Sequence, residues 1–195
     1  MPNYLLIASI IIGSYLISSI PFALVISKFN NVDLRKVGSG NLGATNVYRA
    51  LGFKLAVFVF ILDAAKGLFP TYLAMAIFNQ ASWHVGVGLI TILGHSLSVF
   101  VQFKGGKGVA TGLGVIMALN PTVAAILAVV GFSSIAITRY VAPTSIVCAV
   151  AAPFLFYFFN SPVEYTLFIS FISSVIVIRH KDNIMRLIQG TENKV

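Results

Sequence analysis

Long apolar stretches are the feature of this sequence that most limits its possible folds. Hydrophobic residues make up 58% of the 195 residues and charged residues only 9%, which is more apolar surface than a soluble domain of this size can bury. The sequence therefore predicts an all-α, polytopic membrane helix bundle, formed by a single domain over residues 1–195. A helix needs about 20 apolar residues to cross a bilayer, and six stretches approach that length: 4–27, 55–78, 84–103, 121–138, 141–159 and 163–178.

The distribution of positive charge adds a seventh span and predicts the orientation. The apolar stretch 109–119 rises only about 16 Å as a helix, roughly half the bilayer core. Counting it places every lysine and arginine outside the membrane on one side, and leaves Lys66 as the basic residue inside a span. Because cytoplasmic loops carry the excess of Lys and Arg, we expect seven transmembrane helices, one of them short. The N-terminus is expected outside and the C-terminus in the cytoplasm.

The first of three polar segments on the positive side is VGSGNLGATNVYRA, at 37–50. Its start fits G-x-G-x-x-G, but a dinucleotide site needs a strand before it within a βαβ unit, and this segment follows a membrane helix. Glycine permits left-handed backbone, so consecutive N–H groups can face an anion; a flexible interhelical loop is the alternative. We expect an anion site formed by Gly38, Ser39, Gly40, Asn41, Gly43, Thr45, Asn46 and Arg49.

The second segment, KGGKGVAT at 104–111, places two lysines among three glycines at the start of a short apolar stretch. This arrangement is typical of a phosphate cradle at a helix N-terminus, although no Walker A motif can be written through it. Anchoring by positive charge on the cytoplasmic side would explain the lysines but not the glycines. The residues expected to bind phosphate are Lys104, Gly105, Gly106, Lys107, Gly108 and Thr111.

The third segment is RHKDNIMRLIQGTENK, at 179–194. We expect it to continue from the last span into an amphipathic helix on the membrane surface. His180 and Asn183 are three residues apart and would share one face of that helix. Asp182 and Arg186 are four apart and are expected to form an ion pair on the helix.

Two opposite charges lie within the apolar stretch 55–78. Asp63 and Lys66 are three residues apart, and each would cost about 2.5–3.5 kcal/mol at the bilayer centre, so we expect them to neutralise each other. The interpretation we favour is a structural pair that braces the polar site, with a proton or ion pathway as the alternative. His95, in another apolar stretch, could pair with Asp63 or line the site.

These segments, with LDAAKG at 62–67 and LGH at 93–95, closely resemble the bacterial acyl-phosphate:glycerol-3-phosphate acyltransferases over nearly the whole chain. The resemblance implies an enzyme of the bacterial plasma (inner) membrane with its active site facing the cytoplasm. It would transfer a fatty acyl group from acyl-phosphate to the 1-hydroxyl of glycerol 3-phosphate, giving 1-acyl-glycerol 3-phosphate (lysophosphatidic acid) and phosphate, the first step of phospholipid synthesis. The resemblance implies no metal or other cofactor and no nucleic acid. It implies contact with membrane lipid and a functional link to a soluble acyl-phosphate-forming enzyme and a downstream acyltransferase.

The resemblance also implies roles for particular residues. Ser39 and Arg49 would be needed for activity, and the glycine-rich segment from Lys104 to Gly108 would contribute to binding glycerol 3-phosphate. His180 and Asn183 would matter for catalysis, and Glu192 would be structural. The chain departs from the family pattern at Ser98, where members often have proline, so the bend of the stretch 84–103 is left open.

The mechanism that we expect is direct attack of the glycerol hydroxyl on an already activated donor, in which orientation and charge neutralisation supply most of the rate. His180 is a candidate general base, and a phosphate oxygen of the substrate could take the proton instead. Ser39 as an acyl-enzyme nucleophile is the alternative chemistry. A small organic-phosphate transporter and a non-catalytic phospholipid-binding protein are the alternative classes. A transporter usually shows inverted repeats with interrupted helices in both halves, whereas the glycine motifs here lie only in the first two-thirds of the chain and the third segment resembles neither.

Overall fold

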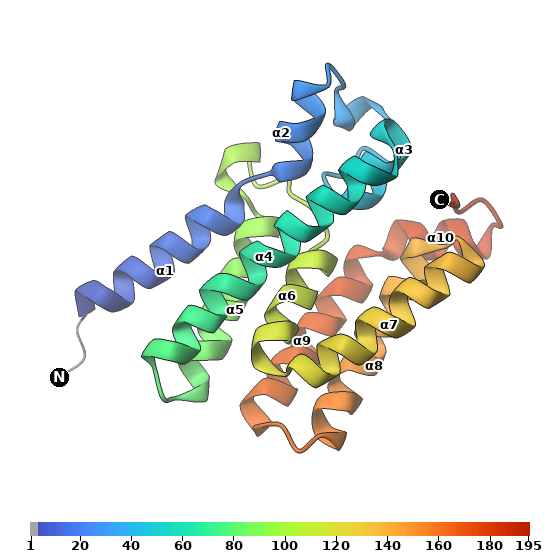
Figure 1. Cartoon of the computed structure of the whole chain (residues 1–195). Helices are drawn as coiled ribbons and strands as arrows, with labels where there is room; N and C mark the ends of the chain where they lie inside the picture. Colours follow the sequence, from blue (N-terminus) through green and yellow to red (C-terminus); the bar gives the residue numbers. More distant parts are fainter. Residues whose placement is uncertain (1–3) are drawn as a thin grey trace. The chain divides into compact units, whose positions relative to one another are not determined.

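The computed structural model describes residues 4–195, which form helices joined by turns and loops (Figure 1). The chain divides into two compact units, with unit 1 ending at Leu119 and unit 2 beginning at Asn120. Unit 1 contains α1 (Tyr4–Ser19), α2 (Phe22–Phe29), the 3₁₀ turn η1 (Leu34–Lys36), α3 (Ala44–Leu51), α4 (Phe53–Ile77), α5 (Ala81–Ser96), the 3₁₀ turn η2 (Val99–Val101) and α6 (Val109–Leu119). Unit 2 contains α7 (Pro121–Thr138), α8 (Val141–Phe158), α9 (Val163–Arg179) and α10 (Lys181–Ile188).

The prediction of an all-α membrane protein is confirmed; six of the seven predicted apolar stretches each contain one α-helix, and the stretch 4–27 contains two, α1 and α2. Within residues 4–195, four helical segments are long and apolar enough to cross a bilayer: Tyr4–Phe29, Ala81–Val101, Pro121–Thr138 and Val141–Phe158. The pair α9 and α10, bent by 55° at their junction, could form a fifth. The count of seven spans and the orientation stay predictions.

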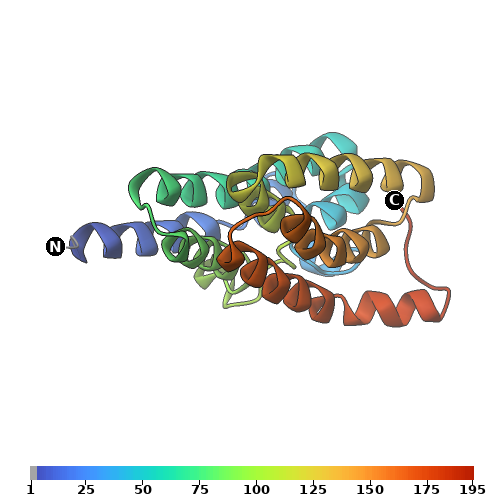
Figure 2. The same cartoon turned by 90° about the horizontal axis from the view of Figure 1, so that it is seen from below.

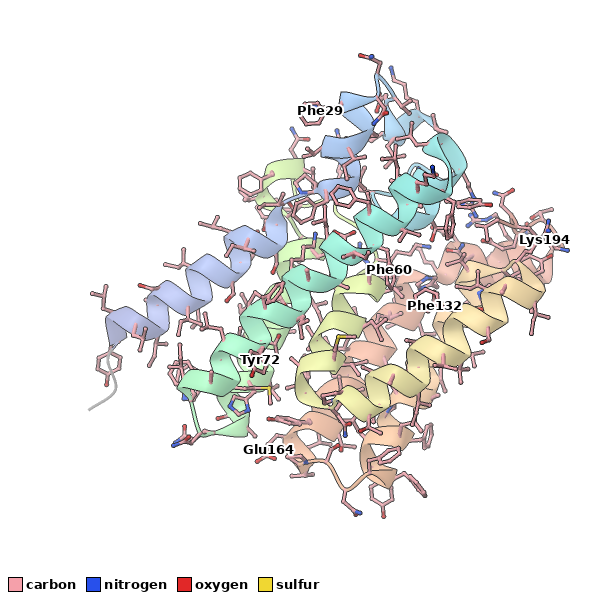
Figure 3. All side chains as sticks on the ribbon, in the orientation of Figure 1. Phe29, Phe60, Tyr72, Phe132, Glu164 and Lys194 are labelled. Atoms are coloured by element: carbon pink, nitrogen blue, oxygen red, sulfur yellow. The ribbon has the colours of Figure 1, made fainter. Side chains whose placement is uncertain are left out.

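Large apolar side chains are exposed on both units. Phe29 and Tyr72 of unit 1 are 83% and 62% exposed, and Phe132 of unit 2 is 53% exposed (Figure 3). Exposed apolar surface on this scale is not tolerated by a soluble monomer and marks contact with lipid or another apolar partner. The hydrocarbon core of a bilayer is the environment that these side chains fit.

The predicted helix over 4–27 is broken in the structure. Residue Pro21 has no N–H and cannot continue a helix, so α1 ends at Ser19 and α2 begins at Phe22. The break places the Ile20 carbonyl beside α4, where it accepts a hydrogen bond from Lys66 Nζ at 3.0 Å. The lysine therefore serves backbone that the break has left outside a helix.

A second proline explains the reverse contact between the same elements. Residue Pro70 lies within α4, and because it lacks an N–H it cannot donate to the carbonyl four residues earlier, that of Lys66. The Ser18 hydroxyl of α1 donates to that carbonyl instead, at 3.0 Å in a buried position. Each helix thus supplies a side-chain donor for backbone of the other.

The bend after α5 occurs with serine at position 98. The backbone of Ser98 has φ −68°, which is also the φ of proline, so the bend does not depend on the residue type found in the family. The Ser98 hydroxyl adds two contacts: it donates to the Ser19 carbonyl at 2.6 Å and accepts from the Phe100 N–H at 3.2 Å. The hydroxyl ties the end of α5 to the break after α1.

Close backbone packing joins α4 to α6. A methyl group on Gly67 would overlap the Thr111 carbonyl, and one on Gly114 would overlap the Ala64 carbonyl. Small residues allow this approach between helices in a membrane, where packing rather than the hydrophobic effect drives association. The short helix α6, which follows the second glycine segment, is thereby fixed against α4.

In unit 2, α8 packs against both α7 and α9. The amphipathic helix predicted in the third segment is α10, which follows directly on α9 (Figure 2). The chain end returns to the α7–α8 turn, where the Val195 N–H donates to the Arg139 carbonyl at 2.9 Å. Glu164 and Lys194 lie at opposite ends of this unit (Figure 3).

Replacing Ser18 by alanine is expected to lower the apparent melting temperature in detergent, because the buried Lys66 carbonyl loses its donor at a cost of about 1–3 kcal/mol. Pro70→Ala restores an N–H to serve that carbonyl, so the cost of Ser18→Ala should shrink in the Pro70→Ala background. Thermal unfolding of the four proteins measures the coupling. Ser9→Ala, which removes a hydroxyl bonded to the Leu5 carbonyl, is the control. Equal costs in both backgrounds would contradict this account.

Candidate functional site

The first glycine segment is held in shape by the side chain of Asn46. This residue is fully buried, and its amide donates to the carbonyls of Leu34 and Val37, each at 3.0 Å. Its Oδ1 accepts the Ser39 N–H at 3.0 Å. A primary amide has two N–H donors, so both are used within the protein.

The loop that Asn46 organises turns twice through left-handed backbone. Gly38 has φ +57° and Gly40 has φ +68°, conformations that a side chain rarely adopts. The loop leads into α3, whose N-cap is Gly43 with no side-chain cap hydrogen bond. The first N–H groups of a helix have no partner within the helix, so the N-terminus of α3 can accept an anion.

The second glycine segment leads into α6 in a similar way. Gly108, with φ +86°, directly precedes Val109, the first residue of α6. The Thr111 hydroxyl in the first turn is buried and has no hydrogen-bond partner in the structure. A helix start with a buried hydroxyl in its first turn is a setting in which phosphate can bind, and the phosphate cradle stays a prediction.

The two glycine segments contact each other. A methyl group on Gly106 would lie 2.9 Å from the Leu42 carbonyl oxygen, and it would also overlap His95 Nε2. Only glycine therefore fits at Gly106, between the first segment and the end of α5. The structure brings both predicted anion sites of unit 1 into one region.

Cationic side chains belong to both segments. Arg49 lies on α3 and is half-buried, with its Cδ 3.4 Å from a methyl group built on Gly38. Lys104 is exposed and Lys107 is half-buried. A guanidinium and two ammonium groups on segments that lead into helix starts suit anionic ligands.

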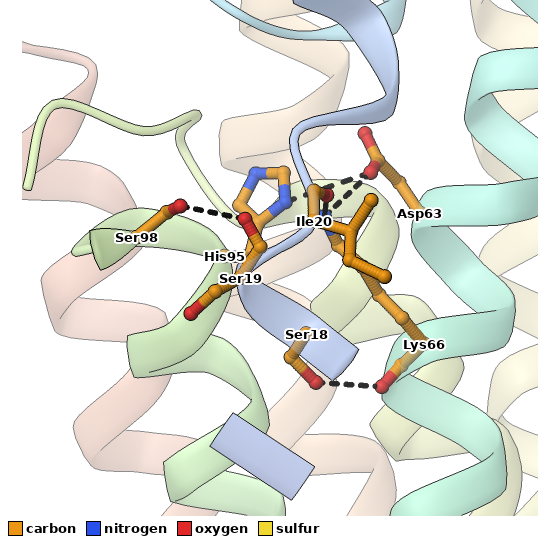
Figure 4. Close-up of polar contacts among 7 residues, drawn as sticks. All are labelled: Ser18, Ser19, Ile20, Asp63, Lys66, His95 and Ser98. Carbon is orange, nitrogen blue, oxygen red and sulfur yellow. Dashed lines mark hydrogen bonds and ion pairs between the residues drawn. The ribbon is translucent and has the colours of Figure 1, made fainter. Parts of the chain in front are cut away.

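Beneath the glycine segments lie three buried ionisable side chains (Figure 4). The expected pair is present, with Lys66 Nζ 2.8 Å from Asp63 Oδ1. The same carboxylate oxygen lies 3.7 Å from His95 Nδ1. Within residues 4–195, no group of three His, Cys, Asp or Glu side chains is arranged to hold a metal ion.

The third segment lies in unit 2. His180 caps the junction of α9 and α10, is buried, and has Nδ1 2.8 Å from the Ile176 carbonyl. Asn183 is also buried and donates to Glu192 Oε1 at 2.8 Å, while Arg186 Nε donates to Glu192 Oε2 at 2.8 Å. The expected pair of Arg186 with Asp182 is wrong, because Glu192 folds back from the chain end and takes the guanidinium.

An apolar groove of about 450 Å³ lies in unit 1 between α1, α2 and α4. Its lining includes Gly13, Phe22 and Phe69, with Lys66 at one side. Because the Lys66 ammonium is already bonded to Asp63 and Ile20, the groove suits a hydrocarbon chain rather than an anion. Its position could not be predicted from the sequence, since its residues come from segments about 50 positions apart.

These features define an all-helical integral membrane protein whose polar region presents two glycine-rich, cationic segments at helix starts. Residues 8–190 match the family described as glycerol-3-phosphate acyltransferase, and the chain belongs to this family of membrane acyltransferases.

Close relatives cover nearly the whole chain. The chain is 46% identical to the glycerol-3-phosphate acyltransferase of Aquifex aeolicus over 95% of its length and 97% of the relative. It is 46% identical to that of Fusobacterium nucleatum over 94% and 95% of the two chains. It also resembles the crystal structure of PlsY (YgiH), an integral membrane glycerol 3-phosphate acyltransferase, in its glycerol 3-phosphate form. The TM-score is 0.93 at 42% identity, over 97% of this chain and 95% of that one. A second structure, the lysophosphatidic acid form, gives a TM-score of 0.90 at 41% identity, over 96% and 94%.

Asn46→Asp keeps an acceptor for the Ser39 N–H but removes both amide donors. The buried carbonyls of Leu34 and Val37 then face a carboxylate, which should cost about 2 kcal/mol or more and abolish most acyl transfer. Thermal unfolding and an acyltransferase assay measure the two effects. Asn41→Asp, at a half-buried position of the same loop, is the matched control for stability, and an equal fall in melting temperature in the two variants would refute the role of Asn46.

Two substitutions of Glu192 separate its two contacts. Glu192→Gln keeps an acceptor for Asn183 but removes the charge that faces Arg186, whereas Glu192→Ala removes both. We expect the apparent melting temperature to fall in the order wild type, Glu192→Gln, Glu192→Ala, because a buried donor without a partner costs about 1–3 kcal/mol. Asp182→Asn, at an exposed position of the same segment, should have little effect. A Glu192→Ala protein as stable as the wild type would contradict the assignment.

Proposed function

We propose that this protein transfers a fatty acyl group from acyl-phosphate to the 1-hydroxyl of glycerol 3-phosphate. The proposal rests above all on the contact between two glycine segments, each of which leads into the start of a helix. Both substrates carry phosphate, and helix N-termini next to cationic side chains are suited to that group. Similarity to PlsY in its glycerol 3-phosphate and lysophosphatidic acid forms supports the same acceptor and product for this chain.

The residues divide into those that would contact phosphate and those that shape the loops. The backbone N–H groups at the starts of α3 and α6, with Arg49, Lys104 and Lys107, would hold and neutralise the phosphates. Thr111 adds a buried hydroxyl. Asn46, whose donors are both used within the loop, would organise the segment rather than contact a substrate.

The reaction would be a direct displacement. The 1-hydroxyl oxygen of glycerol 3-phosphate attacks the acyl carbonyl carbon and forms the new ester bond, the bond from that carbon to the phosphate oxygen breaks, and phosphate leaves. The hydroxyl proton passes to a base. Because acyl-phosphate is already activated, positioning and charge neutralisation can supply most of the acceleration.

The third segment would supply His180 as a candidate general base. A carbonyl oxygen only accepts, so His180 Nδ1 carries the proton toward the Ile176 carbonyl and Nε2 of the neutral ring carries the lone pair. That tautomer suits a general base, and a substrate phosphate oxygen is the other acceptor for the proton. Asn183, oriented by Glu192, would position the acceptor.

The proposal includes the membrane setting that the charges predict. The protein would have seven spans in the bacterial plasma membrane, with the N-terminus outside and all three segments on the cytoplasmic side. The donor would come from a soluble acyl-phosphate-forming enzyme, and a downstream acyltransferase would use the product.

The decisive assay uses purified protein in detergent with labelled glycerol 3-phosphate and a metal chelator. The donor is acyl-phosphate, acyl-CoA or acylated acyl carrier protein. We expect lysophosphatidic acid only from acyl-phosphate. Product from acyl-CoA would contradict acyl-phosphate as the donor, and no product from any donor would contradict the proposed function.

Arg49→Lys keeps the positive charge but replaces the planar guanidinium, which can donate two parallel hydrogen bonds to phosphate. Acyltransferase activity should therefore fall at least tenfold, because charge-assisted bidentate bonds are lost.

The acyl-enzyme alternative has its own test. Intact-protein mass spectrometry after incubation with acyl-phosphate alone should show no added acyl group if attack is direct. An acyl adduct that is absent from Ser39→Ala would establish Ser39 as the nucleophile instead.

A further inference from the structure

The buried group of Asp63, Lys66 and His95 has no task in the displacement described above. The three residues are 2%, 4% and 7% exposed. A buried ion pair is weak evidence for stability, because desolvation of the charges can exceed their attraction. The presence of this buried charged group next to the glycine segments therefore points to a contribution other than stability.

The imidazole of His95 lies between the carboxylate and the second glycine segment. Its Nδ1 is 3.7 Å from Asp63 Oδ1, and its Nε2 lies where a methyl group on Gly106 would be. A carboxylate beside Nδ1 favours the tautomer with the proton on that nitrogen, which turns the lone pair of Nε2 toward Gly106. The ring thus couples the ion pair to backbone that would bind phosphate.

The backbone around His95 supports the same segment. The Gly105 N–H donates to the Ser96 carbonyl at 3.1 Å, and the Phe103 N–H donates to the Ser98 carbonyl at 2.8 Å. A methyl group on Gly105 would overlap the His95 carbonyl. The end of α5 and the turn after it therefore support the second glycine segment, and the His95 imidazole contacts Gly106.

A displacement of Gly106 would also reach the first segment, because Gly106 lies against the Leu42 carbonyl. The Lys66 ammonium holds the other end of the arrangement, since it bonds to both Asp63 and the Ile20 carbonyl. A series of contacts runs from Ile20 through Lys66 and Asp63 to His95 (Figure 4), and His95 in turn lies against Gly106.

We propose that His95, held in place by Asp63 and Lys66, is a positioning residue that sets the geometry of the two glycine segments for binding the phosphate of glycerol 3-phosphate. The inference rests on the proposed function, because it takes that acceptor as the ligand. His95 contacts neither substrate in this proposal and acts through Gly106.

Substitution of His95 has a matched control on the same helix. His84 is also 7% exposed and lies on α5, but its Nε2 is 2.6 Å from the Phe78 carbonyl, at the other end of the helix. His95→Gln is expected to raise the calorimetric Kd and the KM for glycerol 3-phosphate about tenfold, since a misplaced donor costs roughly one hydrogen bond to a charged group. The value of kcat should change less than KM, and His84→Gln should leave Kd within about twofold. Equal Kd values for both variants would overturn the proposal.

A double variant separates positioning from simple bracing. Asp63→Leu with Lys66→Met removes both charges, so neither is left buried without its partner. The Ile20 carbonyl loses the Lys66 donor but keeps the Phe22 N–H at 3.1 Å, so the double variant should still fold, with a modest fall in apparent melting temperature. The double variant should nevertheless show the same loss of affinity as His95→Gln, and adding His95→Gln to it should cause little further loss. A stable double variant that binds glycerol 3-phosphate like the wild type would show a structural role alone and overturn the proposal.

The outcomes also separate this inference from the proposed function. Wild-type protein that neither binds glycerol 3-phosphate nor forms lysophosphatidic acid would overturn the function, and this inference with it. Wild-type protein that does both, while His95→Gln behaves like His84→Gln, would overturn the inference alone. Should His95→Gln fail to fold, Gly106→Ala is the second variant, because its added methyl group would overlap His95 Nε2 and separate the two residues. Gly106→Ala is expected to raise the Kd for glycerol 3-phosphate, and an unchanged Kd would contradict the proposal.

Discussion

The structure depends on how backbone polar groups are satisfied at Pro21, where one membrane helix is broken, and at Pro70, which lies inside another. No water is available in the hydrocarbon region to bond to a free carbonyl, and Pro21 and Pro70 each remove a helix donor. The Ser18 hydroxyl serves the Lys66 carbonyl, whose helical donor Pro70 removes, and Lys66 Nζ bonds to the Ile20 carbonyl at the break before Pro21. One residue of α4 is thus a donor and an acceptor to the end of α1.

This exchange fixes the part of unit 1 that carries the glycine segments. Lys66 is bonded to Asp63, Asp63 lies beside His95, and His95 lies beneath Gly106. The Ser98 hydroxyl bonds the same break after α1 to the turn that leads into the second segment. Rigid support of this kind matters for an enzyme that works by orientation, because small displacements of the reacting groups lose much of the effect.

Much of the fold could be predicted from the sequence, since hydrophobic length and turn residues act locally. The end of α6 and the start of α7 follow from Asn120 and Pro121, a side-chain N-cap and a residue suited to the first helical position. The pair of Asp63 and Lys66 followed from their spacing of three. The break after α1 was missed because Pro21 lies within an unbroken apolar run, and hydropathy does not register a lost N–H.

The candidate site was predicted in its residues more than in its contacts. Asn46 was expected to offer donors to an anion, but it bonds to carbonyls 9 and 12 positions away. Arg186 was assigned to its helical neighbour Asp182 because spacing favours it, whereas the fold brings Glu192 to it. Partners of this kind come from tertiary structure, which periodicity does not encode.

The central claim is that the helix starts after the two glycine segments hold phosphate. The most direct measurement is a crystal structure of this chain with glycerol 3-phosphate. The account predicts phosphate oxygens within hydrogen-bonding distance of backbone N–H groups at the start of α3 or of α6, with Arg49 or Lys104 beside them. A phosphate bound away from both segments would contradict it.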